Sequence, residues 1–356
     1  MFRVQSFDQL VVGAVPGDAI FNEALFIQRA LKARGYSSRI YAERISPALP
    51  RGVALDVRAY RPRRDSTLIF HYSIGSSLNE LVRSYPVRLV LIYHNITPPE
   101  YFRGVNPQIE AQLAQGRAEL GSFKQNCVLA LADSEFNQLE LKESGYARTG
   151  VLPLAFTLGQ HGGADEAMSR LLRNGAVNLL FVGRIAPNKK QDDLIRLLYA
   201  CRQLNPQARL LLVGSWGSTE RYFEWLKTIV ASLELREQVV FAGHVADRVL
   251  RAYYQSADLF VCMSEHEGFC APLVEAMSIG VPVVAYASTG VPYTLGDAGV
   301  LIHEKRWDVV AALCETILTD RRLRDGLVAR QRERAKQFAP EVVRARLEQY
   351  LDLINL

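Results

Sequence analysis

The sequence lacks the features that mark several classes of protein. Its 356 residues include five cysteines and six histidines, and no apolar run is long enough to cross a bilayer. The cysteines lie scattered within apolar runs, so we expect reduced core residues and neither disulfides nor metal ligands. The start of the chain runs into polar residues without the apolar segment of a signal peptide, which predicts a cytoplasmic protein.

Several ligand-binding motifs are missing as well. The chain has no Asp-x-Asp pair, no Walker lysine motif and no His/Cys cluster at metal-ligand spacing, so we expect no metal and no other cofactor. The dinucleotide pattern Gly-x-Gly-x-x-Gly is also absent, because the glycines in residues 213–218 have the wrong spacing, and this argues against a nicotinamide enzyme. Cationic side chains and amides at helix ends would have to bind any diphosphate.

The composition that is present is that of a soluble globular protein. Hydrophobic residues make up 49% and charged residues 22%, and a chain of this length should form about two domains. The net charge of +5 is mild, and we expect no nucleic-acid partner. Basic residues gather at Arg58, Arg61, Arg63 and Arg64 and again in 321–334. These clusters are either solvated surface or a means of attraction to an anionic leaflet or a diphosphate-bearing substrate.

Short β-branched runs alternate with amphipathic stretches along the whole chain, which predicts parallel sheets covered on both faces. We expect strands at 9–14, 38–42, 67–71, 88–94, 128–133, 150–154, 177–182, 209–214, 239–242, 259–263, 281–285 and 300–302. We expect helices at 22–34, 191–203, 219–233, 248–255, 272–279, 307–318, 321–338 and 340–356. The prediction is an α/β protein of two Rossmann-like domains facing each other across a ligand cleft.

The domain junction is predicted from composition. Apolar content falls and glycines cluster in residues 157–165, which marks a linker. We therefore expect one domain at 1–165 and a second at 166–337. The last segment, 338–356, would hold the helix expected after the break at Ala339-Pro340 and pack back on the first domain.

The most informative pair of residues is Glu267 and Glu275. They stand in a segment that reads as a buried strand, a loop, and a helix with Pro272 in its first turn and Gly280 at its end. Open α/β sheets bind ligands at the carboxyl ends of their strands. Backbone amides between the two carboxylates, such as those of Phe269, Cys270 and Ala271, would face an anion there.

A second candidate is the segment from Gly183 to Gln191. Gly183 lets the backbone approach a ligand, while Arg184 and Lys189 can converge on a diphosphate from one loop. The alternative is two solvated surface cations.

These segments together resemble a known family. Gly183-Arg184 with Lys189, then residues 239–245, then Tyr254 to Asp258, then the Glu267 and Glu275 pair, in that order, are similar to the retaining GT-B glycosyltransferases of the family-4 type, also called glycosyl transferases group 1. The resemblance covers nearly the whole second half of the chain. It implies a GT-B fold with the acceptor bound by the first domain and a nucleotide-sugar donor by the second.

The resemblance also implies a role for each matching residue. Arg184 and Lys189, with Gly183 beside them, would neutralise the donor diphosphate, and Glu267 would bind hydroxyls of the donor sugar. The amides of Phe269, Cys270 and Ala271 would line the sugar and phosphate, and Glu275 would bind the ribose. The nucleobase would be framed by the loop after Gly214 and by His244 and Val245. Two departures are Lys190, where the family often has glycine, and Tyr293, where a glutamate is common.

The first half matches the family more loosely. Gly17, in the turn after the first strand, would approach the phosphates without a side chain, although glycine there can be only a turn former. His94 matches a family histidine near the reacting sugar, and a structural role at the strand end is the alternative. His71 is a weaker candidate of the same kind.

The resemblance implies a retaining, metal-independent hexosyltransferase of the EC 2.4 type. It favours mannose from GDP-mannose as the transferred sugar, and a glycan or polyprenyl-diphosphate-linked acceptor in surface polysaccharide synthesis. Such an enzyme would be cytoplasmic, with peripheral attachment at the inner face of the membrane left open. The alternatives are a GT-B sugar-nucleotide epimerase or phosphorylase, and a non-catalytic subunit that binds a nucleotide sugar.

Overall fold

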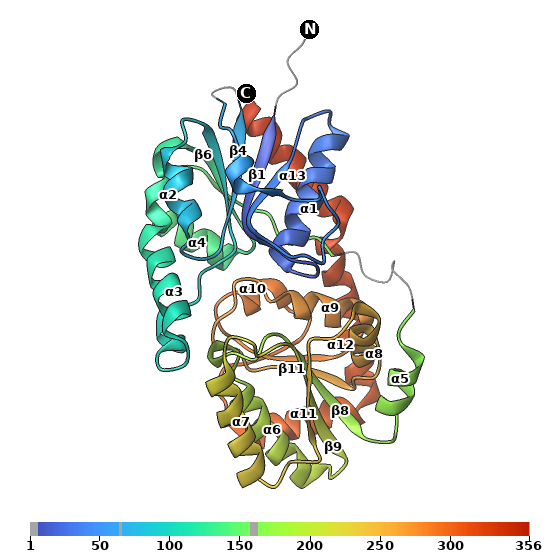
Figure 1. Ribbon diagram of the computed structural model, residues 1–356. Helices are drawn as coiled ribbons and strands as arrows, with labels where there is room; N and C mark the ends of the chain where they lie inside the picture. Colours follow the sequence, from blue (N-terminus) through green and yellow to red (C-terminus); the bar gives the residue numbers. More distant parts are fainter. Residues whose placement is uncertain (1–5, 64–65, 157–162, 356) are drawn as a thin grey trace. The chain divides into compact units, whose positions relative to one another are not determined.

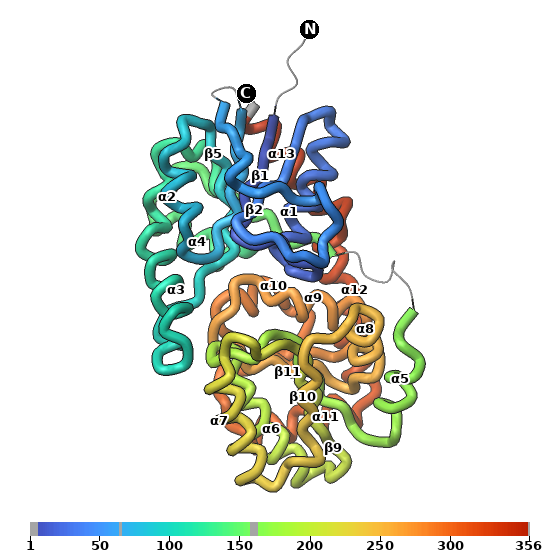
Figure 2. The backbone as a smooth tube through the Cα atoms, viewed as in Figure 1, coloured from blue at the N-terminus to red at the C-terminus, as the bar shows by residue number. Residues whose placement is uncertain are grey.

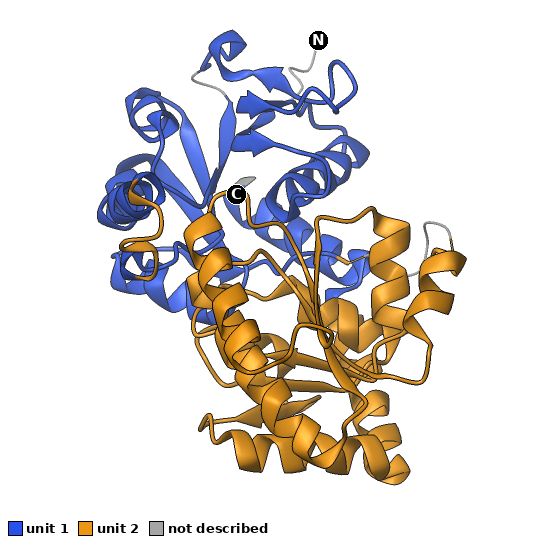
Figure 3. Cartoon of the chain, turned by 60° about the horizontal axis from the view of Figure 1, so that its bottom comes forward, with its two compact units in different colours: residues 1–100, 108–155, 338–356 blue, residues 101–107, 156–337 orange. Residues whose placement is uncertain are grey.

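A computed structural model describes residues 6–63, 66–156 and 163–355. Most of the predicted junction and Arg64 lie outside these residues. The chain forms two compact units (Figure 3), which are described separately. The first unit comprises residues 1–100, 108–155 and 338–356, and the second comprises 101–107 and 156–337. The domain boundaries predicted from the sequence fall between residues 165 and 166 and between residues 337 and 338.

The first unit is built on a parallel sheet. Within the described residues the sheet has seven strands in the order β3-β2-β1-β4-β5-β6-β7. The strands are β1 (Phe7–Ala14), β2 (Ile40–Ile45), β3 (Leu55–Asp56), β4 (Thr67–Tyr72), β5 (Arg88–Tyr93), β6 (Cys127–Ala132) and β7 (Thr149–Val151). The helices are α1 (Ala19–Ala33), α2 (Ser77–Ser84), α3 (Pro107–Glu119), α4 (Glu135–Glu143) and α13 (Pro340–Asn355) (Figure 1).

The second unit repeats this plan. Its described residues form a six-stranded parallel sheet in the order β10-β9-β8-β11-β12-β13, the 3-2-1-4-5-6 order of the Rossmann fold. The strands are β8 (Val177–Val182), β9 (Ala208–Val213), β10 (Val239–Gly243), β11 (Leu259–Cys262), β12 (Val283–Tyr286) and β13 (Val300–Ile302). The helices are α5 (Glu166–Leu172), α6 (Gln191–Leu204), α7 (Glu220–Ser232), α8 (Asp247–Gln255), α9 (Ala271–Ile279), α10 (Val291–Leu295), α11 (Trp307–Thr319) and α12 (Arg321–Ala335). The predicted class of two Rossmann-like α/β domains is confirmed.

Several elements differ from the prediction. The predicted elements include neither the two-residue strand β3 nor the helices α2, α3, α4, α5 and α10. Helix α1 begins three residues earlier than predicted, because the Asp18 side chain accepts a hydrogen bond of 2.9 Å from the amide of Phe21 and caps the helix. Apolar periodicity alone does not reveal such a cap.

The last helix of the chain packs within the first unit. Figure 2 shows the red trace of α13 running beside the blue trace of α1. Leu347 and Leu351 of α13 are each 2% exposed and belong to the same core cluster as Phe7 and Ile92 of the sheet. At the surface, Arg34 Nη2 lies 2.7 Å from Asp352 Oδ1. Apolar burial therefore binds α13 to this unit, since an exposed ion pair adds little.

No helix among the described residues has the length and apolar character needed to cross a membrane.

The packing of α13 predicts the effect of truncating its apolar face. Leu347→Ala should lower the free energy of unfolding by about 2–5 kcal/mol, because it removes buried methyl groups and leaves a cavity. Leu353→Ala, on the same helix at a position 57% exposed, is the matched control and should change it by less than about 0.5 kcal/mol. Urea unfolding followed by circular dichroism measures both. Equal effects at the two positions would contradict the packing described.

Candidate functional site

The site predicted in the second half lies where the strand order of the second sheet reverses. Strands β8 and β11 are neighbours in the sheet although two strands separate them in sequence. Their carboxyl ends therefore bring together residues 183–190, which follow β8, and residues 263–270, which follow β11. This reversal is where open α/β sheets bind ligands.

A cation and a carboxylate meet between these two loops. Lys189 Nζ lies 2.6 Å from Glu267 Oε2, although the residues are 78 positions apart in sequence. Their side chains are 19% and 7% exposed, so both charges are largely withdrawn from solvent. A pair so placed attracts more strongly than a surface pair, and removing either partner leaves a poorly solvated charge.

Local geometry explains how Lys189 reaches this position. Residues Pro187–Lys189 form a single 3-10 turn, and Lys190 follows with a left-handed conformation at φ 54° and ψ 47°. This backbone reverses the chain into helix α6. A residue without Cβ adopts it at least cost, which accounts for the glycine common in the resembling family at position 190. The Lys190 ammonium lies 3.2 Å from Asp192 Oδ2 at the start of α6.

Backbone and hydroxyl groups fix the loop that carries Glu267. The amide of Glu267 donates to Thr289 Oγ1 at 2.8 Å, and that hydroxyl donates back to the Glu267 carbonyl at 2.9 Å. Asn188 donates from Nδ2 to the carbonyl of His266 at 3.0 Å, and its own carbonyl accepts from the amide of Glu265 at 2.9 Å. The Asn188 bonds connect the loops after β8 and β11, so Lys189 and Glu267 are positioned together, and Thr289 ties Glu267 to the loop after β12.

Helix α9 begins directly after this loop. Cys270 has φ 65° and Pro272 lies in the first turn, which ends the loop sharply and starts the helix at Ala271. The first amides of a helix have no acceptor within it, and they carry the positive end of its dipole. Phe269 is 5% exposed, and its ring stacks on Phe156 with centroids 6.0 Å apart. The N-terminal end of α9 thus lies beside the Lys189 and Glu267 loops.

Glu275 projects from the second turn of α9. Its Oε2 accepts a hydrogen bond of 2.5 Å from the Tyr254 hydroxyl of helix α8. Burial raises the pKa of Glu275 above its ordinary value, and the hydrogen bond from Tyr254 opposes this. The bond fixes the carboxyl group and leaves its second oxygen as an acceptor for a ligand hydroxyl.

Two of the predicted glycines pack against each other. Gly214 follows β9 at φ 152°, and a Cβ there would lie 1.9 Å from the carbonyl oxygen of Gly183. Glycine at position 214 is therefore required by the backbone itself, whatever binds there. His244 and Val245 follow β10 at the same edge of the sheet, and His244 is exposed. The Trp216 ring lies 3.4 Å from the position that a Cβ on Gly243 would occupy.

The predicted residues of the first half lie in the other unit. Gly17 is exposed in the β1–α1 turn at φ 79°, with no atom within 4 Å of a Cβ, so its conformation alone favours glycine. His94 follows β5 and its side chain is 2% exposed. His94 Nδ1 lies 3.1 Å from Asp133 Oδ2, and His94 Nε2 lies 3.0 Å from His71 Nδ1.

A buried carboxylate completes this group. The Oε2 atom of Glu23, a residue of α1, lies 3.4 Å from His94 Nε2 and 3.8 Å from His71 Nδ1. Burial raises the pKa of Glu23 to about 8. Burial lowers the pKa of His94, but the charges of Asp133 and Glu23 outweigh it and raise that pKa to about 9. Burial also lowers the pKa of His71 well below its ordinary value.

The structure thus brings some predicted residues together and adds others. Lys189 and Glu267 are in contact, and the predicted residues Gly183, Arg184, Gly214, His244, Val245, Phe269, Cys270, Ala271 and Glu275 lie in the same unit. Arg184 is exposed and forms no ion pair with any described residue. Sequence reasoning did not single out Glu23, Asp133 or Thr289, because their partners are distant in sequence and no spacing reveals them.

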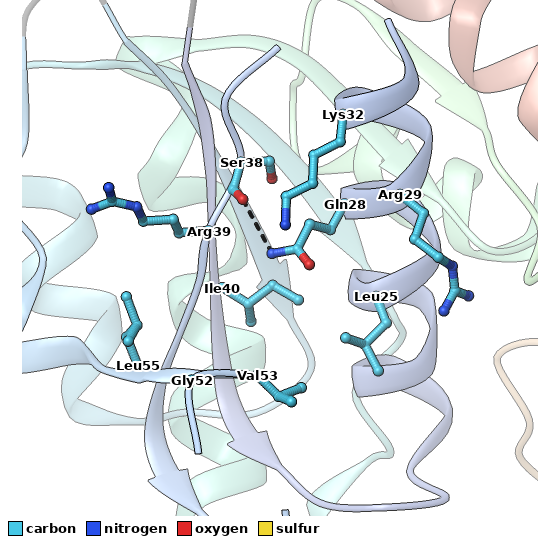
Figure 4. Close-up of a pocket in the computed structure, with 10 residues that line it drawn as sticks. All are labelled: Leu25, Gln28, Arg29, Lys32, Ser38, Arg39, Ile40, Gly52, Val53 and Leu55. Atoms are coloured by element: carbon cyan, nitrogen blue, oxygen red, sulfur yellow. Dashed lines mark hydrogen bonds between the residues drawn. The ribbon is translucent and has the colours of Figure 1, made fainter. Parts of the chain in front are cut away.

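The first unit also has a hollow of about 300 Å³, but it lacks the converging charged groups found around Lys189. It lies between α1 and β2, and its apolar floor includes Leu25, Ile40 and Val53. Figure 4 shows the guanidinium groups of Arg29 and Arg39 pointing away from it on opposite sides. Because its cations do not converge, this hollow is a weaker candidate for an anion than the loops around Lys189.

Comparison with known proteins finds a family model that matches the second unit. Residues 166–338 match the family model "Glycosyl transferases group 1", just under half of the chain. The chain is 34% identical over 176 residues to a D-inositol 3-phosphate glycosyltransferase of Thermomonospora curvata, covering 47% of this chain and 41% of that protein. It is 32% identical over 165 residues to the O-antigen chain mannosyltransferase B of Escherichia coli, covering 46% of this chain and 42% of that protein. The chain thus spans less than half the length of either relative.

A solved structure resembles the whole chain. The HepE protein of Anabaena in complex with UDP and glucose gives a TM-score of 0.73 over 98% of this chain and 99% of that one. At 20% identity this likeness concerns the fold. Together with the two Rossmann-like sheets, it identifies the fold as GT-B. The chain is similar to group 1 glycosyl transferases within that fold.

The close packing of Gly290 against the Glu267 loop predicts that a larger side chain at position 290 destabilises the protein. In Gly290→Ala the new Cβ would lie 2.1 Å from the carbonyl oxygen of Gly268, so the loop must shift and the free energy of unfolding should fall by about 1–3 kcal/mol. Gly326→Ala, in α12 with no atom within 4 Å, is the matched control and should raise it by about 0.5–1 kcal/mol. Chemical denaturation measures both. Unchanged stability in Gly290→Ala would show that the loop is not held as described.

Proposed function

We propose that the chain is a glycosyltransferase that moves a hexose from a nucleotide-diphosphate sugar to an acceptor hydroxyl. One observation carries this proposal. Lys189 Nζ lies 2.6 Å from Glu267 Oε2, beside the N-terminus of α9 and at the point where the strand order of the second sheet reverses. A cation and helix-end amides suit a diphosphate, and an ionised carboxylate suits sugar hydroxyls. The similarity to group 1 glycosyl transferases supports the same reading.

In this proposal each group has a distinct task. Arg184, exposed on the loop after β8, and Lys189 neutralise the charge that develops on the leaving diphosphate. Glu267 accepts hydrogen bonds from the donor sugar, and Glu275, anchored by Tyr254, accepts them from the ribose. Gly183, Gly214, His244 and Val245 line the nucleotide side, and the amides of Phe269, Cys270 and Ala271 line the phosphates.

We propose that transfer retains the configuration of the sugar and needs no metal at the diphosphate. The leaving phosphate accepts the proton of the acceptor on the same face of the sugar, while the cations stabilise its charge. Mannose from GDP-mannose is our first choice of donor, which agrees with the mannosyltransferase among the relatives. UDP-glucose is the competitor, because HepE binds UDP and glucose.

The acceptor we propose is a glycan or a polyprenyl-diphosphate-linked glycan used for surface polysaccharide. We place the reaction in the cytoplasm, and the basic side chains of α12 offer a surface for anionic headgroups. A Kd that weakens with added salt for vesicles containing anionic lipid, compared with neutral vesicles, would support this placement.

Mutations of the two cations test the reaction. After a thermal-shift screen has identified the donor, Arg184→Ala and Lys189→Ala should each lower kcat by about 10²–10³, because each removes a charge that acts on the transition state. Lys227→Ala is the control, since that exposed residue of α7 pairs with Glu224 and lies over the Phe223 ring, on the same helix. Release of nucleotide diphosphate in the presence of acceptor gives the rate. Normal turnover in both variants would contradict the assignment.

A further inference from the structure

A lysine outside the predicted site connects the loops that form it. Lys305 lies between β13 and α11, in a part of the chain that the sequence motifs do not cover. Its Nζ atom lies 2.7 Å from Asp193 Oδ2 and 2.9 Å from Glu265 Oε1. Asp193 belongs to the first turn of α6, and Glu265 to the loop after β11. One ammonium group therefore joins three segments, which follow β8, β11 and β13.

The surroundings of Lys305 hold its ammonium group in one place. The side chain is 16% exposed, and Nζ lies over the ring of Tyr286, at the end of β12, 4.5 Å from the ring centroid. Burial lowers the pKa of Lys305, but the hydrogen bonds to Asp193 and Glu265 outweigh it and raise that pKa above its ordinary value. The group is therefore a charged cation with two carboxylates and an aromatic face as partners.

The Glu265 end of this link reaches the Lys189 and Glu267 pair through the backbone. Glu265 stands two positions before Glu267, and its amide donates to the carbonyl of Asn188 at 2.9 Å. Asn188 directly precedes Lys189 and donates from Nδ2 to the carbonyl of His266 at 3.0 Å. A force that holds the Glu265 side chain therefore also holds the segment in which the two loops are joined.

The Asp193 end reaches the same pair from the side of α6. The amide of Asp193 donates to the carbonyl of Lys190 at 3.0 Å, directly after Lys189. Asp193 Oδ1 also accepts a hydrogen bond of 3.0 Å from Arg196, one turn further along the helix. The Asp193 side chain is 8% exposed. Lys305 thus contacts both loops of the pair on their outer side, one through Glu265 and the other through Asp193.

Stability alone does not account for this arrangement. The Glu265 side chain is 36% exposed, and an ion pair so open to solvent adds little to the free energy of unfolding. Asp193 keeps Arg196 as a partner without Lys305. For charges that are buried, desolvation offsets much of their attraction, and fixing the register of the elements is the best-supported use of such a pair.

We infer that Lys305 is a positioning residue, which holds the loops of Lys189 and Glu267 at the separation that a bound donor requires. It acts through Asp193 and Glu265 and does not itself contact the donor. The effect on turnover rests on the proposed function, whereas the effect on the loops rests on the contacts of Lys305 alone. The two effects are therefore measured separately.

Amide hydrogen exchange in the unliganded full chain tests the effect on the loops. Lys305→Met keeps most of the side-chain volume and removes the charge, so peptides covering 187–193 and 263–269 should exchange about tenfold faster. Lys336→Met is the matched control and should change neither peptide, because Lys336 pairs with Glu333 through side chains that are 70% and 74% exposed. Unchanged exchange in Lys305→Met would overturn the inference, whatever the activity of the chain.

Turnover tests the consequence for the reaction. With the donor found by thermal shift, Lys305→Met should lower kcat about tenfold, because a misplaced charge stabilises the transition state less. In a chain that already carries Lys189→Ala, the same change should cause no further loss, since the cation that it positions is gone. A purely structural role would lower kcat by the same factor in both backgrounds, and this result would overturn the inference. An unmutated chain without transfer would overturn the proposed function, and the exchange rates would still decide whether Lys305 holds the loops.

A second variant keeps the test decisive if Lys305→Met does not fold. Glu265→Gln removes the carboxylate at the exposed end of the link and leaves Asp193 with Lys305. It should therefore speed exchange in 263–269 and leave exchange in 187–193 unchanged. A Glu265→Gln chain that exchanges like the unmutated chain in both peptides would contradict the inference.

Discussion

The ion pair between Lys189 and Glu267 is the interaction on which the account of the second unit depends. Its partners come from two loops that meet only because β8 and β11 are neighbours in the sheet. The bonds of Asn188 join the two loops, Thr289 fixes the Glu267 loop, and Cys270 turns the chain so that α9 begins beside them. Two charged groups are therefore already held at the strand ends, as the proposed stabilisation of a developing charge requires.

Both units use the same edge of a parallel sheet to gather polar groups, but the two sets differ in kind. In the second unit, Arg184 and His244 remain exposed to solvent and the Lys189 side chain is 19% exposed. In the first unit, Glu23, His71 and Asp133 are buried and the imidazoles are engaged with protein oxygens. The partly exposed set of the second unit suits a ligand that comes and goes. The buried set of the first unit is already bonded within the protein.

Much of the second unit could be predicted because its information is local in sequence. The strand, loop and helix around Glu267, with Pro272 in the first turn and Gly280 at the end, lie where the sequence places them. The left-handed backbone of Lys190 could not be predicted, since lysine gives no signal of it. Nor could the Glu23, His71 and His94 group, whose members come from three separate elements and share no spacing. The expectation of no metal rests on spacing alone and stays a prediction. The roles assigned to the site residues stay predictions.

A crystal structure of the full chain with the nucleoside diphosphate that most raises its melting temperature tests the central claim most directly. The account predicts phosphate oxygens within about 3 Å of Lys189 Nζ and of the amides at the start of α9. It also predicts that Glu267 faces the side of the diphosphate where a sugar would be attached. A nucleotide bound elsewhere, for example in the hollow between α1 and β2, with the Lys189 and Glu267 pair untouched, would contradict it.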